Sequence, residues 1–210
     1  MWINIFNWFT KITGWPVQKI CFRTAVYYED QDIQDRKING PAIIISNHTS
    51  VWDYAVWLFV FYNRTLRFQM AEVLFKRPGL GLLLRQLGGI YVDRNSHDFS
   101  FITKSEKILK RGGVVGIFPE SRLPKPGEER PLPFKPSTAF LALSSGVKLI
   151  PVYTDGSYFN KKHANVIIGC PIYAGDFTDD NASEKENIEI ISNVLRKRII
   201  ELGNKLDEIK

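Results

Sequence analysis

From residue 41 onward, short runs of β-branched residues alternate along the chain with segments of helical periodicity. The clearest strand pattern is the run of isoleucines within residues 42–46, and the clearest helix is residues 183–205, where apolar side chains recur along one face. Strands are expected at residues 42–46, 66–70, 89–92, 114–118, 148–154 and 165–168, and helices at 53–62, 79–87, 98–110, 138–144 and 183–205. Such alternation predicts an α/β, three-layer domain with a largely parallel or mixed central sheet.

The first thirty residues follow a different pattern, with a wide aromatic face and a narrow polar stripe. The stripe consists of three residues at helical spacing, Asn4, Asn7 and Lys11. The sequence Gly-Trp-Pro at residues 14–16 then predicts a break, because proline cannot continue a helix but suits the first turn of the next one. A second helix is expected at residues 17–28. The prediction is a helical hairpin at residues 1–30, followed by the main domain at residues 31–210.

Two interpretations of this N-terminal segment stay open. Three of the five tryptophans lie within the first fifteen residues, and tryptophan favours the bilayer interface because its ring is apolar while its N–H needs a polar partner. The segment is either an amphipathic two-helix membrane-association motif or a hairpin packed on the core of its own domain. The longest apolar run, at residues 54–62, is far shorter than the ~20 residues that cross a bilayer, so no spanning segment is predicted.

Composition indicates a folded protein whose basic character lies in its first part. The 210 residues are 44% apolar and 24% charged, which disfavours intrinsic disorder and a polytopic membrane protein. Residues 1–150 hold 20 Lys and Arg against 12 Asp and Glu, while residues 151–210 hold 8 against 10. Such a surplus is either solvated surface or attracts nucleic acid, anionic lipid or an acidic carrier. Cys21 and Cys170 indicate free thiols in a reducing, intracellular compartment.

The loop after the first predicted strand carries the strongest chemical signal. His48 and Asp53 lie five positions apart, where the loop turns into the next helix. A carboxylate that accepts a hydrogen bond from one ring nitrogen raises the basicity of the other, although so short a pair also arises by chance. Ser50 lies too close in sequence to serve as a nucleophile, and no G-x-S-x-G elbow occurs. What remains is a general base suited to deprotonating a substrate hydroxyl.

Two further loops at strand ends carry charged residues. In residues 88–94 two glycines precede an arginine, and this pattern suits phosphate because backbone N–H groups can approach closely while the guanidinium binds two oxygens. In residues 117–122 a carboxylate and a cation follow a proline that stiffens the strand exit, so Glu120 is expected at the same edge as His48. Taken singly, each loop is also compatible with a plain charged turn.

Together, in this order and spacing, the three loops resemble the glycerolipid acyltransferase family, whose best-known members are the lysophosphatidate acyltransferases. The family motifs N-H-x-S-x-x-D, G-x-x-x-[VI]-D-R, F-P-E-G-T-R and [VI]-[VI]-P-[VI] resemble residues 47–53, 88–94, 118–122 and 149–152. The resemblance covers about residues 41–155. It implies that residues 31–210 form an acyltransferase domain, which moves a fatty acyl group from an acyl thioester to the hydroxyl of a lysolipid, foremost lysophosphatidate, in phospholipid biosynthesis.

The resemblance also implies roles for individual residues. His48 would remove the hydroxyl proton and Asp53 would hold His48, so that the acceptor oxygen attacks the thioester directly. Arg94 would bind the acceptor phosphate, and Glu120 would position the acceptor or support the His48 loop. The other substrate-binding residues are expected to be Gly89, Ser121, Arg122 and Pro151. The partners would be the acyl donor, either acyl-CoA or acyl carrier protein, the lysolipid acceptor and a membrane surface on its cytoplasmic face. No metal, further cofactor or nucleic acid is expected.

The chain departs from the family pattern where the acceptor is bound. Ser121 and Arg122 directly follow Phe-Pro-Glu, so the family's glycine is lost and Arg122 lies one position early. Before Leu74, where the family often has lysine, the chain has Ala71 and Glu72. These changes weaken lysophosphatidate as the acceptor more than they weaken acyl transfer. A lysophospholipid with a larger headgroup, or an acyl-amino-acid lipid, therefore stays open.

Two other classes of function remain as alternatives. The first is a non-catalytic membrane-surface protein, against which the intact pair of His48 and Asp53 argues. The second is a nucleic-acid-binding module. The basic run at residues 196–198 follows a Glu-rich helix start, so it is better explained as charge that complements the helix dipole. His97 and His163 lack partners at metal-ligand spacing and are predicted to be surface or hydrogen-bonded histidines.

Overall fold

A computed structural model of the chain describes residues 2–94, 98–159 and 163–210. The helices are α1 Trp2–Cys21, α2 Asp53–Val60, α3 Glu72–Phe75, α4 Leu80–Gln86, α5 Ser100–Lys110, α6 Pro136–Ser145 and α7 Glu184–Ile209, with a 3₁₀ turn η1 at Ala174–Phe177. The strands are β1 Ala25–Tyr28, β2 Ala42–Ser46, β3 Leu66–Ala71, β4 Ile90–Val92, β5 Val114–Ile117, β6 Lys148–Thr154 and β7 Asn165–Ile168.

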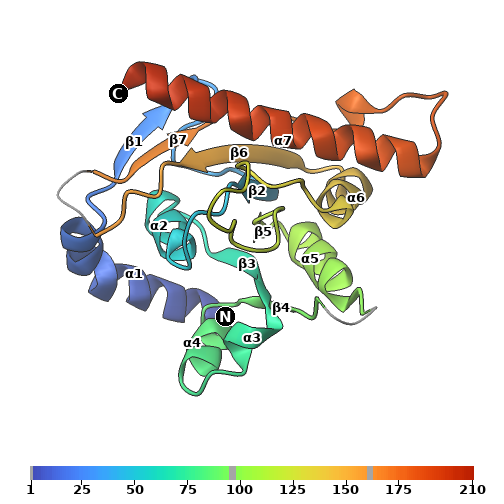
Figure 1. The fold of residues 1–210 in the computed structure, drawn as a ribbon. Coiled ribbons are helices and arrows are strands. Elements are labelled where there is room, and N and C mark those ends of the chain that lie inside the picture. The colour runs from blue at the N-terminus through green and yellow to red at the C-terminus, as the bar shows by residue number, and fades with distance from the viewer. Residues whose placement is uncertain (1, 95–97, 160–162) are drawn as a thin grey trace.

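Within the described residues, these strands form one mixed sheet in the order β1-β7-β6-β2-β5-β3-β4 (Figure 1). Neighbouring strands run parallel, except that β6 and β7 are antiparallel. Parallel neighbours need crossover connections, which the helices provide. The central strand β2 pairs with β5 on one side and β6 on the other. The loops that follow these three strands therefore meet at one edge of the sheet.

Helices cover both faces of the sheet and produce three layers. On one face α2, α3 and α4 pack against alternate strand residues such as Ile44. On the other face α5, α6 and α7 pack against Ile43 and Ile45. Successive residues of a strand point to opposite faces, and β2 is buried at every position because both of its faces contact a core. The three-layer α/β fold with a mixed sheet is confirmed.

From residue 42 onward, the predicted helices and strands are confirmed to within a few residues at their ends. The bounds of β2, β6 and β7 agree with the prediction. At the start of α7, Ser183 accepts a hydrogen bond from the backbone N–H of Glu186, and the Glu186 side chain accepts one from the backbone N–H of Ser183. The prediction lacks α3 and η1, since such short elements contain too few positions to show a period.

The predicted helical hairpin at residues 1–30 is wrong. α1 is one continuous helix with Pro16 inside it. Residues 25–28, expected to end a second helix, form β1, which pairs with β7. Lys11 and Gln18, on either side of the proline, are both buried, and this packing holds the two halves of the helix in line. Tertiary contacts here override the local signal for a break.

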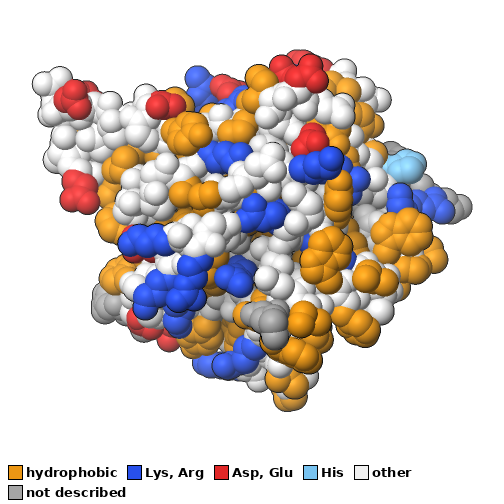
Figure 2. Space-filling model, turned by 180° about the vertical axis from the view of Figure 1, so that it is seen from behind, with side chains coloured by type: hydrophobic (Ala, Val, Ile, Leu, Met, Phe, Trp, Pro, Cys, Tyr) orange, Lys and Arg blue, Asp and Glu red, His pale blue; other side chains and the backbone are white. Residues whose placement is uncertain are grey.

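α1 turns Asn7 and Lys11 of its polar stripe toward the domain, whereas Asn4 and the aromatic face are exposed. The side-chain amide of Asn7 donates to the carbonyl of Leu87 at 2.9 Å. Nζ of Lys11 donates at 3.3, 3.0 and 2.6 Å to the carbonyls of Phe61, Tyr62 and Arg64. The exposed apolar residues of α1 are Trp2, Ile5, Trp8, Phe9, Ile12, Trp15, Val17 and Ile20. Figure 2 shows hydrophobic side chains gathered on this side of the molecule. A helix on the surface of a soluble protein usually turns its apolar face toward the core and its polar face toward the solvent.

Across the described residues, no helix combines the length and the hydropathy that would let it cross a membrane.

Candidate active site

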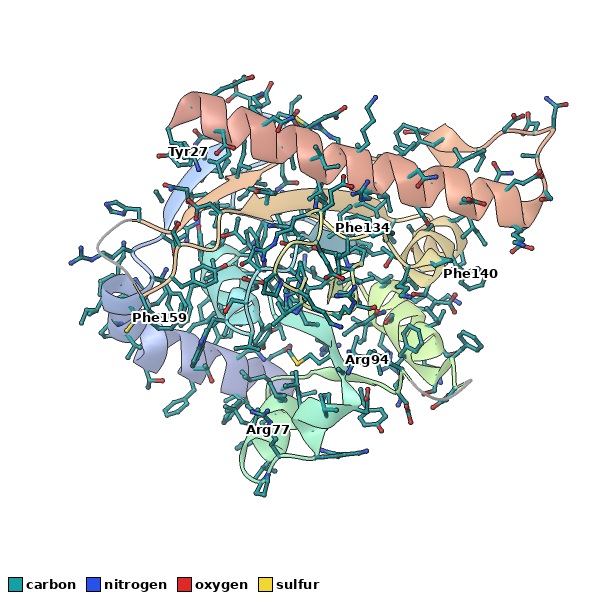
Figure 3. The ribbon with its side chains drawn as sticks, in the orientation of Figure 1. Tyr27, Arg77, Arg94, Phe134, Phe140 and Phe159 are labelled. Atoms are coloured by element: carbon teal, nitrogen blue, oxygen red, sulfur yellow. The ribbon has the colours of Figure 1, made fainter. Side chains whose placement is uncertain are left out.

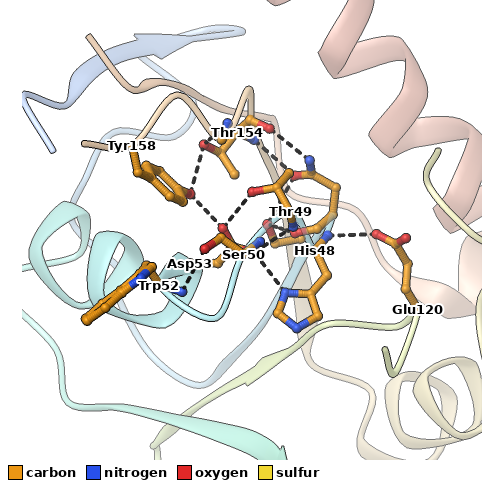
Figure 4. A network of polar contacts seen from close by, with 11 residues as sticks. His48, Thr49, Ser50, Trp52, Asp53, Glu120, Thr154 and Tyr158 are labelled. Carbon is orange, nitrogen blue, oxygen red and sulfur yellow. Dashed lines mark hydrogen bonds and ion pairs between the residues drawn. The ribbon is translucent and has the colours of Figure 1, made fainter. Parts of the chain in front are cut away.

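The predicted histidine–aspartate pair is formed in the loop between β2 and α2. Nδ1 of His48 lies 2.8 Å from Oδ2 of Asp53 (Figure 4). The same oxygen accepts hydrogen bonds from the backbone N–H groups of Thr49 at 2.7 Å and Ser50 at 2.9 Å. Asp53 is fully buried at the first position of α2. The loop thus folds back around the carboxylate, which is what places the histidine against it.

The second carboxylate oxygen of Asp53 is held by two hydroxyl groups. Oγ1 of Thr49 donates to Oδ1 at 2.8 Å, and the hydroxyl of Tyr158 donates to it at 2.7 Å. Tyr158 follows β6 and lies 105 positions from Asp53 along the chain. Sequence reasoning missed this residue because it belongs to none of the motifs, and no local pattern marks it.

The ring of His48 is also fixed across its flat face. It stacks on Phe118, with ring centroids 4.3 Å apart and planes 17° apart. With Nδ1 directed to Asp53, the ring presents Nε2 as its acceptor, and the side chain is 19% exposed. Over the described ranges, no serine or cysteine is hydrogen-bonded to the ring. The arrangement is that of a general base without a protein nucleophile.

Glu120 supports the His48 loop from the neighbouring strand. Its Oε1 accepts a hydrogen bond from the backbone N–H of His48 at 2.7 Å, and its Oε2 accepts one from Leu132 at 2.8 Å. The side chain is buried. Burial raises the pKa of Glu120, and the two hydrogen bonds oppose that rise without cancelling it. Because both oxygens are occupied by backbone donors, these contacts favour the supporting role over contact with the acceptor.

A pocket opens beside Phe118, which therefore contacts both the pocket and the ring of His48. The apolar part of the pocket includes Met70, Val92, Phe101, Ile117 and Phe118. The polar part consists of Gln69, Arg94, Ser121, Lys135, Ser137 and Thr138. Two of the predicted substrate-binding residues, Arg94 and Ser121, thus line one cavity, and Lys135, which lies outside the four motifs, adds a second cation.

Arg94 lies at the end of β4, close to α5 in Figure 3. Its Nε lies 3.4 Å from a carboxylate oxygen of Glu72, and its Nη1 donates to the carbonyl of Ser121 at 3.3 Å. Although burial acts to raise the pKa of Glu72, the hydrogen bonds from Arg94 lower it below its ordinary value. Glu72 is therefore ionised at neutral pH and offsets part of the charge that Arg94 brings to the pocket.

The shortened third loop changes the position of its cation. Arg122 pairs with Glu128 through two hydrogen bonds of 2.7 and 2.8 Å, and this pairing lowers the pKa of Glu128 to about 2. Arg122 is engaged there instead of lining the pocket. Ser121, where the family motif has glycine, has a φ of 59°, in the left-handed region that favours glycine. A serine thus takes the backbone conformation of the missing glycine.

Gly89 and Pro151 are packing residues in this structure. A Cβ added at Gly89 would lie 3.0 Å from the carbonyl oxygen of Leu84, so only glycine fits there without a shift. Pro151 lies inside β6 and is buried next to Gly169, where Leu202 of α7 also packs. Neither residue lines the pocket, so the pocket does not support their expected role in binding the substrate.

The other candidate residues lie outside this site. Nδ1 of the exposed His163 lies 2.7 Å from the carbonyl oxygen of Arg23, as expected for a hydrogen-bonded surface histidine. His97 falls outside the described residues. Within the part of the chain that is described, no three His, Cys, Asp or Glu side chains gather where they could hold a metal ion. Arg196 and Arg198 of the basic run each pair with a glutamate.

Fold and site together define a class of protein: an α/β domain that carries a histidine–aspartate pair at the carboxyl edge of its sheet. A family model described as "Acyltransferase" matches residues 25–155. A 1-acyl-sn-glycerol-3-phosphate acyltransferase of Bacillus subtilis is 30% identical over 149 residues, which are 69% of this chain and 72% of that protein. The 1-acyl-sn-glycerol-3-phosphate acyltransferase beta of Homo sapiens is 27% identical over 158 residues, which are 72% of this chain and 55% of that protein.

Among solved structures, the 1-acyl-sn-glycerophosphate acyltransferase PlsC from Thermotoga maritima has the same fold, with a TM-score of 0.65 at 21% identity. The match covers 96% of this chain and 79% of that one. The chain belongs to the acyltransferase family, in the group whose named members are 1-acyl-sn-glycerol-3-phosphate acyltransferases. The predicted resemblance to this family is confirmed.

Proposed function

We propose that this acyltransferase moves a fatty acyl group from acyl-CoA or acyl carrier protein to the free hydroxyl of a lysophosphatidate-type lysolipid, in phospholipid biosynthesis. The observation that carries the proposal is the 2.8 Å contact between Nδ1 of His48 and Oδ2 of Asp53. The names of the relatives support the class of acceptor. The reaction calls for no cofactor, since the thioester donor is already activated toward attack by a hydroxyl.

In the proposed reaction, Nε2 of His48 takes the proton of the acceptor hydroxyl while that oxygen bonds to the thioester carbonyl carbon. The tetrahedral intermediate then breaks its carbon–sulfur bond, and the departing sulfur takes the proton from His48. Asp53 stabilises the positive imidazolium that exists between these steps. The products are a diacyl lipid and a free thiol, and the enzyme returns to its starting state.

The pocket beside Phe118 is where we expect the acceptor's polar headgroup to bind. Arg94 and Lys135 supply positive charge, and Ser137 and Thr138 supply hydroxyl donors. Phosphate oxygens suit such a set, because charged donors form the stronger hydrogen bonds. Phe118 lies between this pocket and His48, so a headgroup bound there would leave the acceptor hydroxyl near the base.

A different lysolipid is the second candidate, and two ion pairs favour it. Glu72 balances part of the charge of Arg94, and Glu128 takes up Arg122. The pocket therefore offers less uncompensated positive charge than a phosphate monoester could use. A lysophospholipid with a larger headgroup or an acyl-amino-acid lipid carries less negative charge and fits this reduced positive charge better.

We further propose that α1 attaches the enzyme to a membrane surface without crossing it. Its exposed tryptophans suit the interface of a bilayer. The apolar surface continues to the active-site loop: the rings of Trp52 and Phe159 are both exposed and lie 5.3 Å apart, and the ring of Phe22, directly after α1, contacts both. A lysolipid held in that membrane would reach His48 from the same side. The free thiols of Cys21 and Cys170 support the cytoplasmic face.

Thiol release from long-chain acyl-CoA tests the proposed activity. The purified protein is assayed with lysophosphatidate, lysophosphatidylglycerol, lysophosphatidylethanolamine and an acyl-amino-acid lipid, and again with acyl carrier protein as donor. Release that depends on one acceptor and is lost in His48→Ala supports the proposal and identifies the acceptor. Absence of release with every acceptor and both donors would contradict it.

A further inference from the structure

Tyr158 is a buried contact of the active site that the proposed reaction has not yet used. Its hydroxyl donates to Oδ1 of Asp53 at 2.7 Å (Figure 4). It is carried by the segment after β6, whereas His48 and Asp53 belong to the loop after β2. The hydrogen bond therefore connects the segment after β6 with the loop after β2.

The two oxygens of Asp53 are held differently. Oδ2 accepts from Nδ1 of His48 and from two backbone N–H groups of the same loop. Oδ1 accepts from two hydroxyls: that of Thr49 belongs to the same loop, whereas that of Tyr158 belongs to the segment after β6. A carboxylate is free to rotate about its last bond unless both oxygens are fixed. The contact from Tyr158 thus fixes the plane of the carboxylate with respect to the sheet.

Tyr158 is itself held in place, and it carries a proton to donate. Its hydroxyl lies 3.2 Å from Oγ1 of Thr154, the last residue of β6. Its ring meets the ring of Phe22 edge-on, with centroids 5.5 Å apart. Burial, and then the charge of Asp53, raise the pKa of Tyr158 above its ordinary value, so the phenol is protonated at neutral pH. The hydroxyl is a permanent donor to the carboxylate.

We propose that Tyr158 is a positioning residue for the acyl transfer, and that its hydroxyl orients Asp53 so that Oδ2 stays on Nδ1 of His48. The inference rests on the proposed function, because it assigns Tyr158 a part in keeping His48 ready to accept the substrate proton. Tyr158 acts through Asp53 and touches no reacting atom.

The positioning role predicts a change in pH dependence. Without the hydroxyl, Oδ2 of Asp53 is held less firmly on Nδ1 of His48 and stabilises the protonated imidazole less, so the acid limb of the kcat profile moves to lower pH. Among the described residues, the carboxylates that contact His48 are Asp53, through Nδ1, and Glu120, through the backbone N–H from the neighbouring strand. Both carboxylates are kept when Tyr158 is replaced by phenylalanine.

The test compares Tyr158→Phe with Tyr54→Phe as the matched control. The hydroxyl of Tyr54 is buried and has no hydrogen-bond partner, although the residue is adjacent to Asp53 in the chain. In Tyr158→Phe we expect kcat to fall roughly tenfold, as for loss of other outer hydrogen bonds to a functional ligand. We expect KM to stay within about twofold, and the acid limb to fall by about 0.5 pH unit. Tyr54→Phe should match the wild type in all three.

A measurement independent of turnover separates this inference from the proposed function. The NMR signal of the Nδ1 proton of His48, identified by its loss in His48→Ala, should move in Tyr158→Phe and stay in place in Tyr54→Phe. If the wild type is inactive with every acceptor, the proposed function fails, and this signal alone decides whether Tyr158 positions the pair. A folded Tyr158→Phe that matches Tyr54→Phe in kcat, pH profile and proton signal would overturn the inference.

Should Tyr158→Phe fail to fold, Thr154→Val provides the second test. It removes the hydroxyl that lies 3.2 Å from the hydroxyl of Tyr158. The expected result is a smaller fall in kcat and a smaller downward shift of the acid limb than in Tyr158→Phe. Wild-type behaviour of Thr154→Val in kcat, pH profile and the His48 proton signal would overturn the inference in that case.

Discussion

Replacing Asp53 by asparagine should remove the charge from the active site while keeping the fold. Oδ2 of Asp53 faces N–H donors, whereas Oδ1 faces the hydroxyls of Thr49 and Tyr158. A hydroxyl can both donate and accept. Asparagine can therefore direct its oxygen to the N–H groups and its amide to the hydroxyls, which turn to accept. We expect Asp53→Asn to change the free energy of unfolding by less than about 1 kcal/mol.

The lost charge sets the expected fall in rate. A carboxylate about 4 Å from the imidazolium charge contributes roughly 4 kcal/mol at an effective dielectric constant of about 20. The contact between Nδ1 of His48 and Oδ2 of Asp53 is 2.8 Å, which puts the centres of the two charges near that separation. Since about 1.4 kcal/mol corresponds to a tenfold change in rate, kcat should fall roughly 1,000-fold.

Thiol release at saturating lysolipid measures kcat for Asp53→Asn, and urea unfolding measures its stability. Asp207→Asn is the matched control, because Asp207 is an exposed residue of α7 outside the site. If Asp53→Asn is folded and keeps more than about a tenth of the wild-type kcat, the carboxylate charge does not act on the histidine as argued here.

Three further predictions concern other parts of the molecule. Phe9→Ser should weaken cosedimentation with phosphatidylglycerol–phosphatidylethanolamine vesicles roughly tenfold or more. Phe140→Ser, on the opposite side of the fold, should leave cosedimentation unchanged, and equal losses in the two variants would rule out attachment through α1. Glu120→Gln leaves one buried backbone N–H facing an amide donor. In urea unfolding, its free energy of unfolding should therefore be about 2 kcal/mol lower than that of Glu128→Gln. Equal free energies in the two variants would refute the supporting role. Burial lowers the pKa of Lys11 from 10.5 to about 8. The unfolded chain therefore keeps that proton to higher pH, so this group makes the free energy of unfolding rise between pH 8 and 10.5. Lys11→Met should abolish that rise. An unchanged dependence of the free energy of unfolding on pH in this variant would contradict the prediction.

The central sheet and the catalytic pair could be predicted because their signals are local. The isoleucines of β2 suit a strand buried on both faces, and the structure places that strand in the middle of the sheet. His48 and Asp53 are separated by only one tight loop, so their contact follows from a short stretch of chain. Signals of this kind depend little on how the rest of the molecule packs.

The N-terminal segment shows where local signals fail. Pro16 predicts a break, but α1 continues through it because Lys11 and Gln18 are buried on either side. The orientation of the helix is equally non-local. Asn7 and Lys11 of the polar stripe face inward because they donate hydrogen bonds to backbone carbonyls of the domain that lie far away in sequence, at the ends of other helices. A helical period alone does not determine which face of a helix packs against the protein.

Two features of the site could not be predicted from the sequence motifs. The hydroxyl of Tyr158 reaches Asp53 only because β6 lies beside β2 in the sheet. Arg122 pairs with Glu128 within its own loop, so its place in the motif does not bring it to the pocket. Its partner is six positions away and belongs to a stretch without a regular period, which is why the motif alone predicted the wrong surroundings.

Direct transfer with His48 as the base is the central claim, and counting thiol, lipid product and protein mass together tests it most directly. The purified protein is mixed with acyl thioester in the presence and absence of the lysolipid acceptor. The account predicts one free thiol for each diacyl lipid, formed only when acceptor is present, no acylated protein, and loss of both products in His48→Ala. A protein mass increased by one acyl group during turnover, or turnover that survives His48→Ala, would contradict it.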